Sequence, residues 1–226
     1  MNENILRDLQ SMQDKEYKAF NTKLIPDLKE EVIGVRLPLI RAYAKKIKST
    51  ETAAAFLRDL PHKYQEENLL HAFLIGEEKD FSKAITLAEA FLPYVNNWAV
   101  CDSFKVKAFK KEKEQLLPYI KKWSKSPHTY TVRFSILQLM SYFLDEAFKT
   151  EYLALVSNIK SNEYYIQMAQ AWYFATAIAK QEKEALKYIE EKKLETVVLN
   201  KTIQKAIESF RVSDETKQYL RSLRIN

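Results

Sequence analysis

Hydrophobic residues recur at intervals of three and four along most of the chain. Ile5, Leu9 and Met12 show this spacing first, and it predicts a helix that ends near Phe20. A second helix is predicted to start at Pro38, because proline is favoured in the first helical turn. Further predicted helices cover residues 51–60, 63–75, 79–92, 98–110, 112–124, 129–144, 147–159, 162–180, 182–192, 196–209 and 214–224. This pattern is typical of an all-α protein.

Proline and glycine mark the connections between these helices. Pro26 and Gly34 interrupt the pattern between Leu24 and Arg36. Other prolines fall near predicted helix ends, namely Pro61, Pro93, Pro118 and Pro127. The predicted connections are therefore short.

The later helices resemble one another. Arg133, Met168 and Lys205 occupy similar places in three related segments and lie 35 and 37 residues apart. A period of this length with two helices per unit predicts a curved solenoid of HEAT-like antiparallel helix pairs, about 12–14 helices in all. In such a stack the second helices line a concave surface, and residues 1–226 are expected to form one domain.

The low glycine content argues against two other kinds of structure. Only Gly34 and Gly76 occur, whereas average usage would give about fifteen. Tight hairpins and phosphate-binding loops both need glycine at positive φ. A hairpin-rich sheet and a glycine-rich nucleotide loop are therefore not expected.

The charge balance weakly favours a polyanionic partner. The chain has 36 basic and 30 acidic residues, for a net charge of +6. Arg41, Lys45 and Lys48 form a basic stripe at i, i+4 and i+7 on the helix that begins at Pro38. Such a stripe is either a solvated face or a row of phosphate contacts.

Several classes of site and location are not expected. The single cysteine excludes an internal disulfide and suits a reducing compartment. His62, His71 and His128 lack the spacing of metal ligands, so neither a metal nor another cofactor is predicted. No apolar run is long enough to cross a membrane, and the polar N-terminus is not a signal peptide. We expect a cytoplasmic monomer.

One short apolar stretch, residues 95–104, carries a candidate for chemistry. Trp98 and Asp102 are four residues apart, so in a helix they share one face. An aromatic ring beside a poorly solvated carboxylate suits a positively charged ligand or transition state. The alternative is a core or capping tryptophan, with the acid paired to a nearby lysine.

Two later residues have similarly open interpretations. Arg133 lies near the start of a strongly apolar helix, where the guanidinium and the helix N-terminus both favour an anion such as a phosphodiester. It could equally pair with a buried acid such as Asp102. Trp172 could fill space between helices, the commoner role of a lone aromatic residue, or face the groove.

An ordered set of motifs carries a resemblance to a known family. The set comprises Gly34-Val35-Arg36-Leu37-Pro38, Asn97-Trp98 before Asp102, Arg133, Ile166-Gln167 before Trp172, and the segment from Asn200 to Ala206. The chain thereby resembles the DNA alkylation repair proteins of the AlkD type over most of its length. These are HEAT-like-repeat glycosylases that act on N3- and N7-alkylated purines.

The resemblance implies roles for particular residues. Asp102 would stabilise the oxocarbenium-like sugar and position or activate water, while Trp98 and Trp172 would contact the cationic nucleotide. Arg133 would hold a backbone phosphate. The partner would be double-stranded DNA that carries alkylated purines. Candidate phosphate contacts at basic helix starts are Arg41, Lys45, Lys105, Lys201 and Lys205.

Two positions depart from the family pattern, which tends to have paired tryptophans before the acid and a basic residue shortly after the later tryptophan. Here Asn97 precedes Trp98, and residues 175–177 are Ala-Thr-Ala. Fewer cations are therefore expected beside Trp172. The alternative function is a non-catalytic HEAT-like scaffold whose cleft binds a peptide or nucleic acid.

Overall fold

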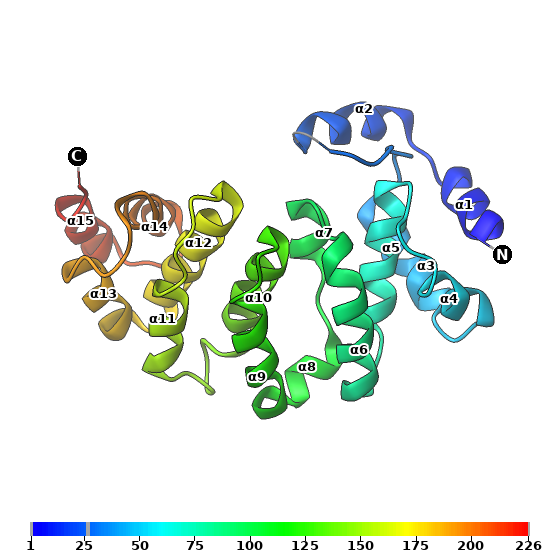
Figure 1. Ribbon diagram of the computed structural model, residues 1–226. Helices are drawn as coiled ribbons and strands as arrows, with labels where there is room; N and C mark the ends of the chain where they lie inside the picture. Colours follow the sequence, from blue (N-terminus) through cyan, green and yellow to red (C-terminus); the bar gives the residue numbers. More distant parts are fainter. Residues whose placement is uncertain (1, 26–27, 226) are drawn as a thin grey trace. The chain divides into compact units, whose positions relative to one another are not determined.

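The computed structural model of the protein describes residues 2–25 and 28–225. Pro26, predicted to interrupt the helical pattern, lies outside the described residues. The described residues form fifteen α-helices and one short 3-10 helix (Figure 1). Their only β-type pairing is an isolated bridge between Glu31 and Tyr64. The all-α prediction is confirmed.

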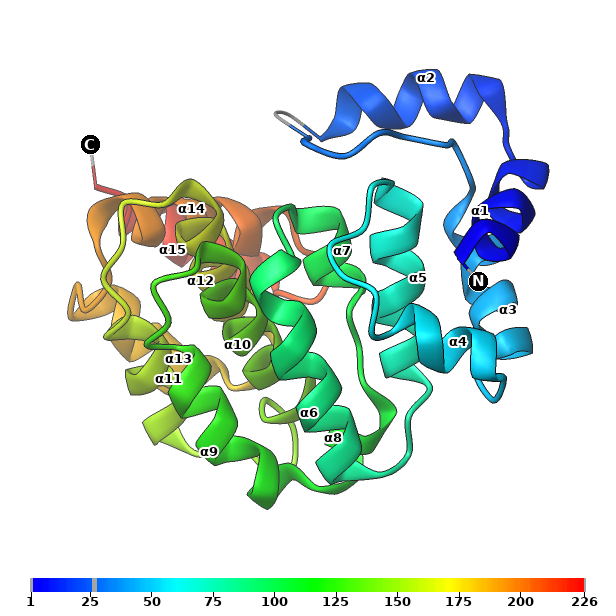
Figure 2. The same cartoon turned by 45° about the vertical axis from the view of Figure 1, so that its right-hand side comes forward.

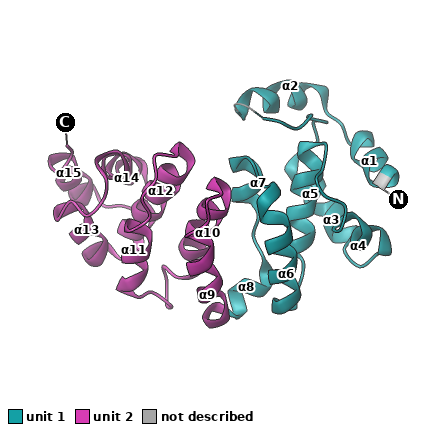
Figure 3. Cartoon of the chain, in the orientation of Figure 1, with its two compact units in different colours: residues 1–112 teal, residues 113–226 magenta. Residues whose placement is uncertain are grey.

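The chain divides into two compact units, residues 1–112 and 113–226 (Figure 3). Unit 1 contains α1 (Asn2–Ser11), α2 (Lys15–Leu24), α3 (Leu37–Ile47), α4 (Glu51–Phe56), α5 (Gln65–Gly76), α6 (Phe81–Phe91), η1 (Leu92–Tyr94), α7 (Trp98–Ser103) and α8 (Lys107–Lys111). Unit 2 contains α9 (Lys113–Trp123), α10 (Thr129–Tyr142), α11 (Thr150–Ser157), α12 (Tyr164–Lys180), α13 (Glu182–Glu190), α14 (Thr196–Glu208) and α15 (Asp214–Ser222). The prediction of a single domain over residues 1–226 stays a prediction.

Two predicted helices are each divided in the structure, which raises the number of helices above the predicted 12–14. The first divides because the Asp14 side chain accepts a hydrogen bond from the Tyr17 amide at 2.9 Å and so starts α2. The predicted helix over residues 98–110 ends at Ser103, and Phe104 has φ −79° and ψ 85°, outside the helical region. Pro118 lies inside α9 and not at a joint, which removes one helical hydrogen bond.

In unit 2 the second helix of each pair packs beside the next. Helix α12 contacts α10 and α14 (Figures 1 and 2). Most of α10 is buried, including Phe134 and Ile136, which are fully covered. Arg133 and Met168 hold matching places early in α10 and α12. Lys205, in contrast, lies in the last turn of α14, so the 37-residue spacing does not preserve the position within the helix.

Unit 1 is built around α5, whose twelve residues are all buried. It packs against α3 and α7. The carboxylate of Glu66 accepts hydrogen bonds from the backbone amides of Ile33, Gly34 and Val35 at 2.9, 2.7 and 3.2 Å. This buried acid therefore fixes the loop that leads into α3.

His62 and His71, which the sequence did not associate, are direct neighbours in unit 1. Nε2 of His62 lies 2.8 Å from Nδ1 of His71, so one ring donates a hydrogen bond to the other. The His62 ring stacks on Phe56 at a centroid distance of 4.3 Å, and His71 stacks on Phe91 at 4.1 Å. Burial lowers the pKa of His62 to about 4, opposed by the nearby charge of Asp59, and lowers the pKa of His71 well below its usual value.

Replacing Gly34 with alanine should destabilise the protein. Gly34 has φ +98°, and an added Cβ would lie 2.6 Å from Cβ of Lys18 and 2.8 Å from the Asp14 carbonyl oxygen. Backbone strain alone costs about 1–3 kcal/mol, and the close contacts add to it. Urea unfolding of Gly34→Ala should show this loss. Lys46→Ala, on the exposed side of α3, should unfold like the unmodified protein.

The free energy of unfolding should fall as the pH drops from about 6.5 towards 4. The folded state disfavours the protonated histidines, so their contribution is complete above the unfolded pKa and is lost as protons bind below it. Each histidine that takes up a proton contributes a slope of up to about 1.4 kcal/mol per pH unit. Urea unfolding at about pH 7 and about pH 5 measures this slope.

The double variant His62→Gln with His71→Gln provides the control for this pH effect. Amide side chains can still form a hydrogen bond but do not titrate. The variant should therefore lose less stability between the two pH values. An equal loss in both proteins would assign the effect to other groups.

Candidate functional site

Helix α7 presents Trp98 and Asp102 on one face, as their spacing predicted. Both side chains are half-buried. Val100 on the opposite face and Cys101 beside Trp98 anchor the helix in the interior, each 1% exposed. The tryptophan ring and the carboxylate are therefore held at the edge of the core of unit 1, and neither is enclosed within it.

The position of α7 depends on Asn97, which caps the helix. Its Oδ1 accepts a hydrogen bond from the Val100 amide at 3.1 Å. The same side chain forms a reciprocal amide pair with Gln65 on α5, with distances of 3.2 and 3.0 Å. Both residues are buried, at 3% and 0% exposure. Where the family pattern would place a second tryptophan, this chain uses an amide that ties α7 to α5.

Arg133 in unit 2 has a structural partner that the sequence did not suggest. The residue is 5% exposed, and Nη1 donates a hydrogen bond to the Tyr165 carbonyl oxygen at 2.8 Å. This bond joins the start of α10 to the start of α12. Arg133 therefore helps to hold two neighbouring helices of unit 2 in place. Its proposed phosphate contact stays a prediction.

Trp172 does not fill the core, because 39% of its surface is exposed. It borders a pocket of about 210 Å³ in unit 2. The other lining residues come from α12 and from the end of α14, namely Ala175, Thr176, Lys205, Glu208, Ser209 and Arg211. The structure thus brings together two predicted residues, Trp172 and Lys205, and adds Arg211, which sequence reasoning missed. These two cations come from the segment at and after the end of α14, and the expectation of fewer cations than in relatives stays a prediction.

Most of the lysines that were predicted at basic helix starts lie elsewhere in the structure. Lys45 lies in the last turn of α3 and Lys205 in the last turn of α14, where the partial negative charge of the helix end stabilises a cation. Lys105 lies between α7 and α8, and Lys201 lies within α14 with Nζ 3.1 Å from Oε1 of Gln204. The prediction of basic helix starts is therefore wrong for Lys45, Lys201 and Lys205, whereas Lys105 directly precedes Val106, the N-cap of α8.

The basic stripe on α3 is partly engaged within unit 1. Arg41 places its guanidinium carbon 4.0 Å from the centroid of the Phe73 ring, although the residue as a whole is exposed. Lys48 pairs with Glu77 at 3.1 Å. All three residues are exposed, and within the described part of the chain Lys45 alone among them has neither an ion pair nor a contact with an aromatic ring. Its contact with phosphate stays a prediction.

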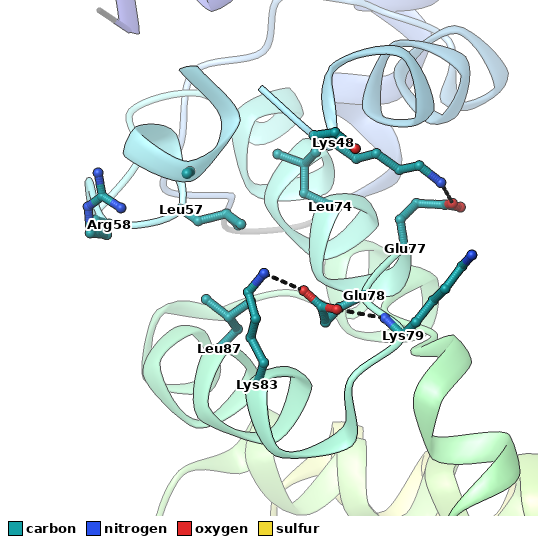
Figure 4. Close-up of a pocket in the computed structure, with 11 residues that line it drawn as sticks. Lys48, Leu57, Arg58, Leu74, Glu77, Glu78, Lys79, Lys83 and Leu87 are labelled. Carbon is teal, nitrogen blue, oxygen red and sulfur yellow. Dashed lines mark hydrogen bonds and ion pairs between the residues drawn. The ribbon is translucent and has the colours of Figure 1, made fainter. Parts of the chain in front are cut away.

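A larger pocket in unit 1, of about 600 Å³, has ion pairs on two of its four cations (Figure 4). Lys83 pairs with Glu78 at 2.7 Å, and the Lys79 amide donates to the same carboxylate at 2.8 Å. Lys48 contributes its pair with Glu77 to the rim. The two remaining cations of this lining, Arg58 and Lys79, keep it positively charged, but no aromatic ring of the described residues lines this pocket as Trp172 lines the other one.

Among the described residues, no group of three or more histidine, cysteine or acidic side chains is arranged to hold a metal ion. Within the same residues, no helix has both the length and the apolar character needed to cross a membrane.

Comparison with known protein families identifies the chain as a DNA alkylation repair protein by its sequence. The family model described as DNA alkylation repair enzyme matches residues 5–210, which is most of the chain. No curated protein sequence matches it. The matched range includes Trp98, Asp102, Arg133 and Trp172 but ends before Arg211.

Removing the Asn97 side chain should destabilise unit 1. Asn97→Ala loses the helix cap, worth about 1 kcal/mol, and leaves the Gln65 amide buried without its partner, at a cost of about 1–3 kcal/mol. Asn97→Ser keeps a capping oxygen and should recover about 1 kcal/mol of the loss. Urea unfolding compares the two. If both variants match the unmodified protein, the amide pair does not stabilise α7.

Proposed function

Because the chain belongs to the DNA alkylation repair enzyme family, we propose that it is a DNA glycosylase that excises N3- and N7-alkylated purines from duplex DNA. The observation that carries this proposal is the pairing of Trp98 with Asp102 on α7, next to the buried cap of Asn97. A ring and a carboxylate in this arrangement suit a positively charged transition state.

The proposed reaction needs little proton transfer to the leaving group. Alkylation at N3 or N7 places a positive charge on the purine, so the base leaves with the electron pair of the glycosidic bond as a neutral molecule. The sugar becomes oxocarbenium-like as that bond breaks. Asp102 stabilises this charge, and water then bonds to the anomeric carbon and releases a proton. A half-buried carboxylate stabilises the charge better than a fully solvated one, because water screens it less.

The two tryptophans have a related role in this proposal. Each ring offers its face to a nucleotide of the bound DNA, and such a contact with a cationic base is worth about 0.5–2 kcal/mol. Trp98 and Trp172 both retain exposed surface, which such a contact requires.

The DNA backbone is held by cations in this proposal. Arg133 contacts a phosphate of the DNA, while the partly or fully exposed lysines supply further contacts, namely Lys45, Lys105, Lys201 and Lys205. Arg41, held against Phe73, is a more rigid contact of the same kind. Affinity for duplex DNA should therefore fall as salt rises.

Asp102→Asn should abolish base release while preserving the shape of the side chain. Loss of one charge-stabilising group typically lowers the rate by about 10²–10³-fold. The measurement is chromatography of 7-methylguanine and 3-methyladenine released from methylated duplex DNA. Affinity for unmodified duplex should change little, because the carboxylate is not a phosphate contact.

Asp214→Asn is the matched control, since it removes one carboxylate from a fully exposed side chain in α15. It should release bases at the unmodified rate. If the unmodified protein releases no base at any enzyme concentration, the glycosylase proposal is wrong. Duplex binding without release would then favour the scaffold alternative.

A further inference from the structure

We propose that the pocket beside Trp172 binds one phosphodiester of the DNA strand and the nucleoside attached to it. Lys205 and Arg211 are the phosphate ligands, and Trp172 contacts the nucleoside. This inference rests on the proposed function in that DNA is the partner. It adds a binding site and a residue, Arg211, that lies beyond the part of the chain matched by the family model.

The local backbone keeps the two cations together. Lys205 lies in the last turn of α14, and the chain then turns, with the Ser209 amide bonded to the Ala206 carbonyl at 3.2 Å. The Ser209 hydroxyl accepts a hydrogen bond from the Arg211 amide at 3.2 Å. The next residue, Val212, is 5% exposed and anchors the turn in the core. Arg211 is therefore presented at the pocket by a defined turn.

The electrostatics of the pocket favour an anion. Within residues 2–25 and 28–225, neither Lys205 nor Arg211 forms an ion pair. The one acid in the lining is Glu208. Its carboxylate accepts a hydrogen bond from the side-chain amide of Gln204 at 3.0 Å and not from either cation. Two cations and one carboxylate leave the lining with a net positive charge.

The aromatic residues indicate that the anion belongs to a nucleotide. Trp172 is 39% exposed at the pocket, and Phe210, between Ser209 and Arg211, is completely exposed. Exposed rings interleaved with cations are typical of surfaces that hold nucleic acid strands, where rings contact sugars or bases and cations contact phosphates. A volume of about 210 Å³ is smaller than most pockets for whole small molecules, but it accommodates a phosphate group with part of its sugar.

Arg211→Gln tests the phosphate contact directly. Removing one phosphate contact reduces the steepness of the plot of log affinity against log salt concentration by about 0.9. The measurement is fluorescence anisotropy of a labelled, unmodified duplex at potassium chloride concentrations from about 50 to 200 mM. Lys205→Gln should have the same effect. Because Arg211 is exposed, the Arg211→Gln variant should unfold at the same temperature as the unmodified protein.

Two further variants separate the apolar contact from the ionic one. Trp172→Ala should weaken binding by roughly five- to a hundredfold without changing the salt slope, because an apolar contact releases no counterions. Arg221→Gln is the matched control, an exposed arginine on α15 outside the pocket lining. It should leave both the affinity and the slope unchanged.

The outcomes distinguish this inference from the proposed function. Unchanged salt slopes in both Arg211→Gln and Lys205→Gln would overturn the phosphate site, even if Asp102→Asn abolishes base release. Reduced slopes support the site, including in a protein that binds DNA but releases no base. Binding of an acidic peptide in place of DNA, lost in Arg211→Gln, would overturn the assignment to a nucleotide.

Discussion

Three buried polar side chains in the first turn of α5 determine the structure of unit 1. Gln65 pairs with Asn97 and so holds the start of α7. Glu66 binds three successive backbone amides of the loop before α3. Glu67 accepts from the amides of Lys63 and Tyr64 at 3.2 and 3.0 Å, which caps α5 itself. One helical turn therefore fixes three segments, and the candidate site depends on it because α7 carries Trp98 and Asp102.

Hydrophobic spacing predicted most helices because it reports which face of a helix is buried. The same spacing placed Trp98 and Asp102 correctly on one face. It could not identify the role of Glu66, because an acidic residue at a helix start normally indicates a solvated end. Contacts between distant segments were also missed: the ring pair of His62 and His71 forms across a turn, and Arg211 reaches Trp172 only through the packing of α14 on α12.

The cations of the chain differ in whether they form ion pairs with acidic residues of the same protein. Lys48 and Lys107 both pair with Glu77, at 3.1 and 2.6 Å, so its one negative charge compensates one of their two positive charges. Lys205 and Arg211 have no such ion pair within the described part of the chain. Net charge alone does not separate these groups, since all contribute equally to the total of +6. Pairing shows which of them can replace the counterions of a polyanion.

The amide pair between Gln65 and Asn97 has a consequence for how the protein responds to its surroundings. Both side chains are uncharged and buried, so neither protons nor dissolved ions act on the bond that holds α7. The affinity for a polyanion, in contrast, depends on exposed cations and falls as the salt concentration rises. The orientation of Trp98 and Asp102 therefore does not depend on ionic strength, whereas the affinity for DNA does. A rise in salt should shorten the residence of DNA on the protein and leave the geometry of Trp98 and Asp102 unaltered.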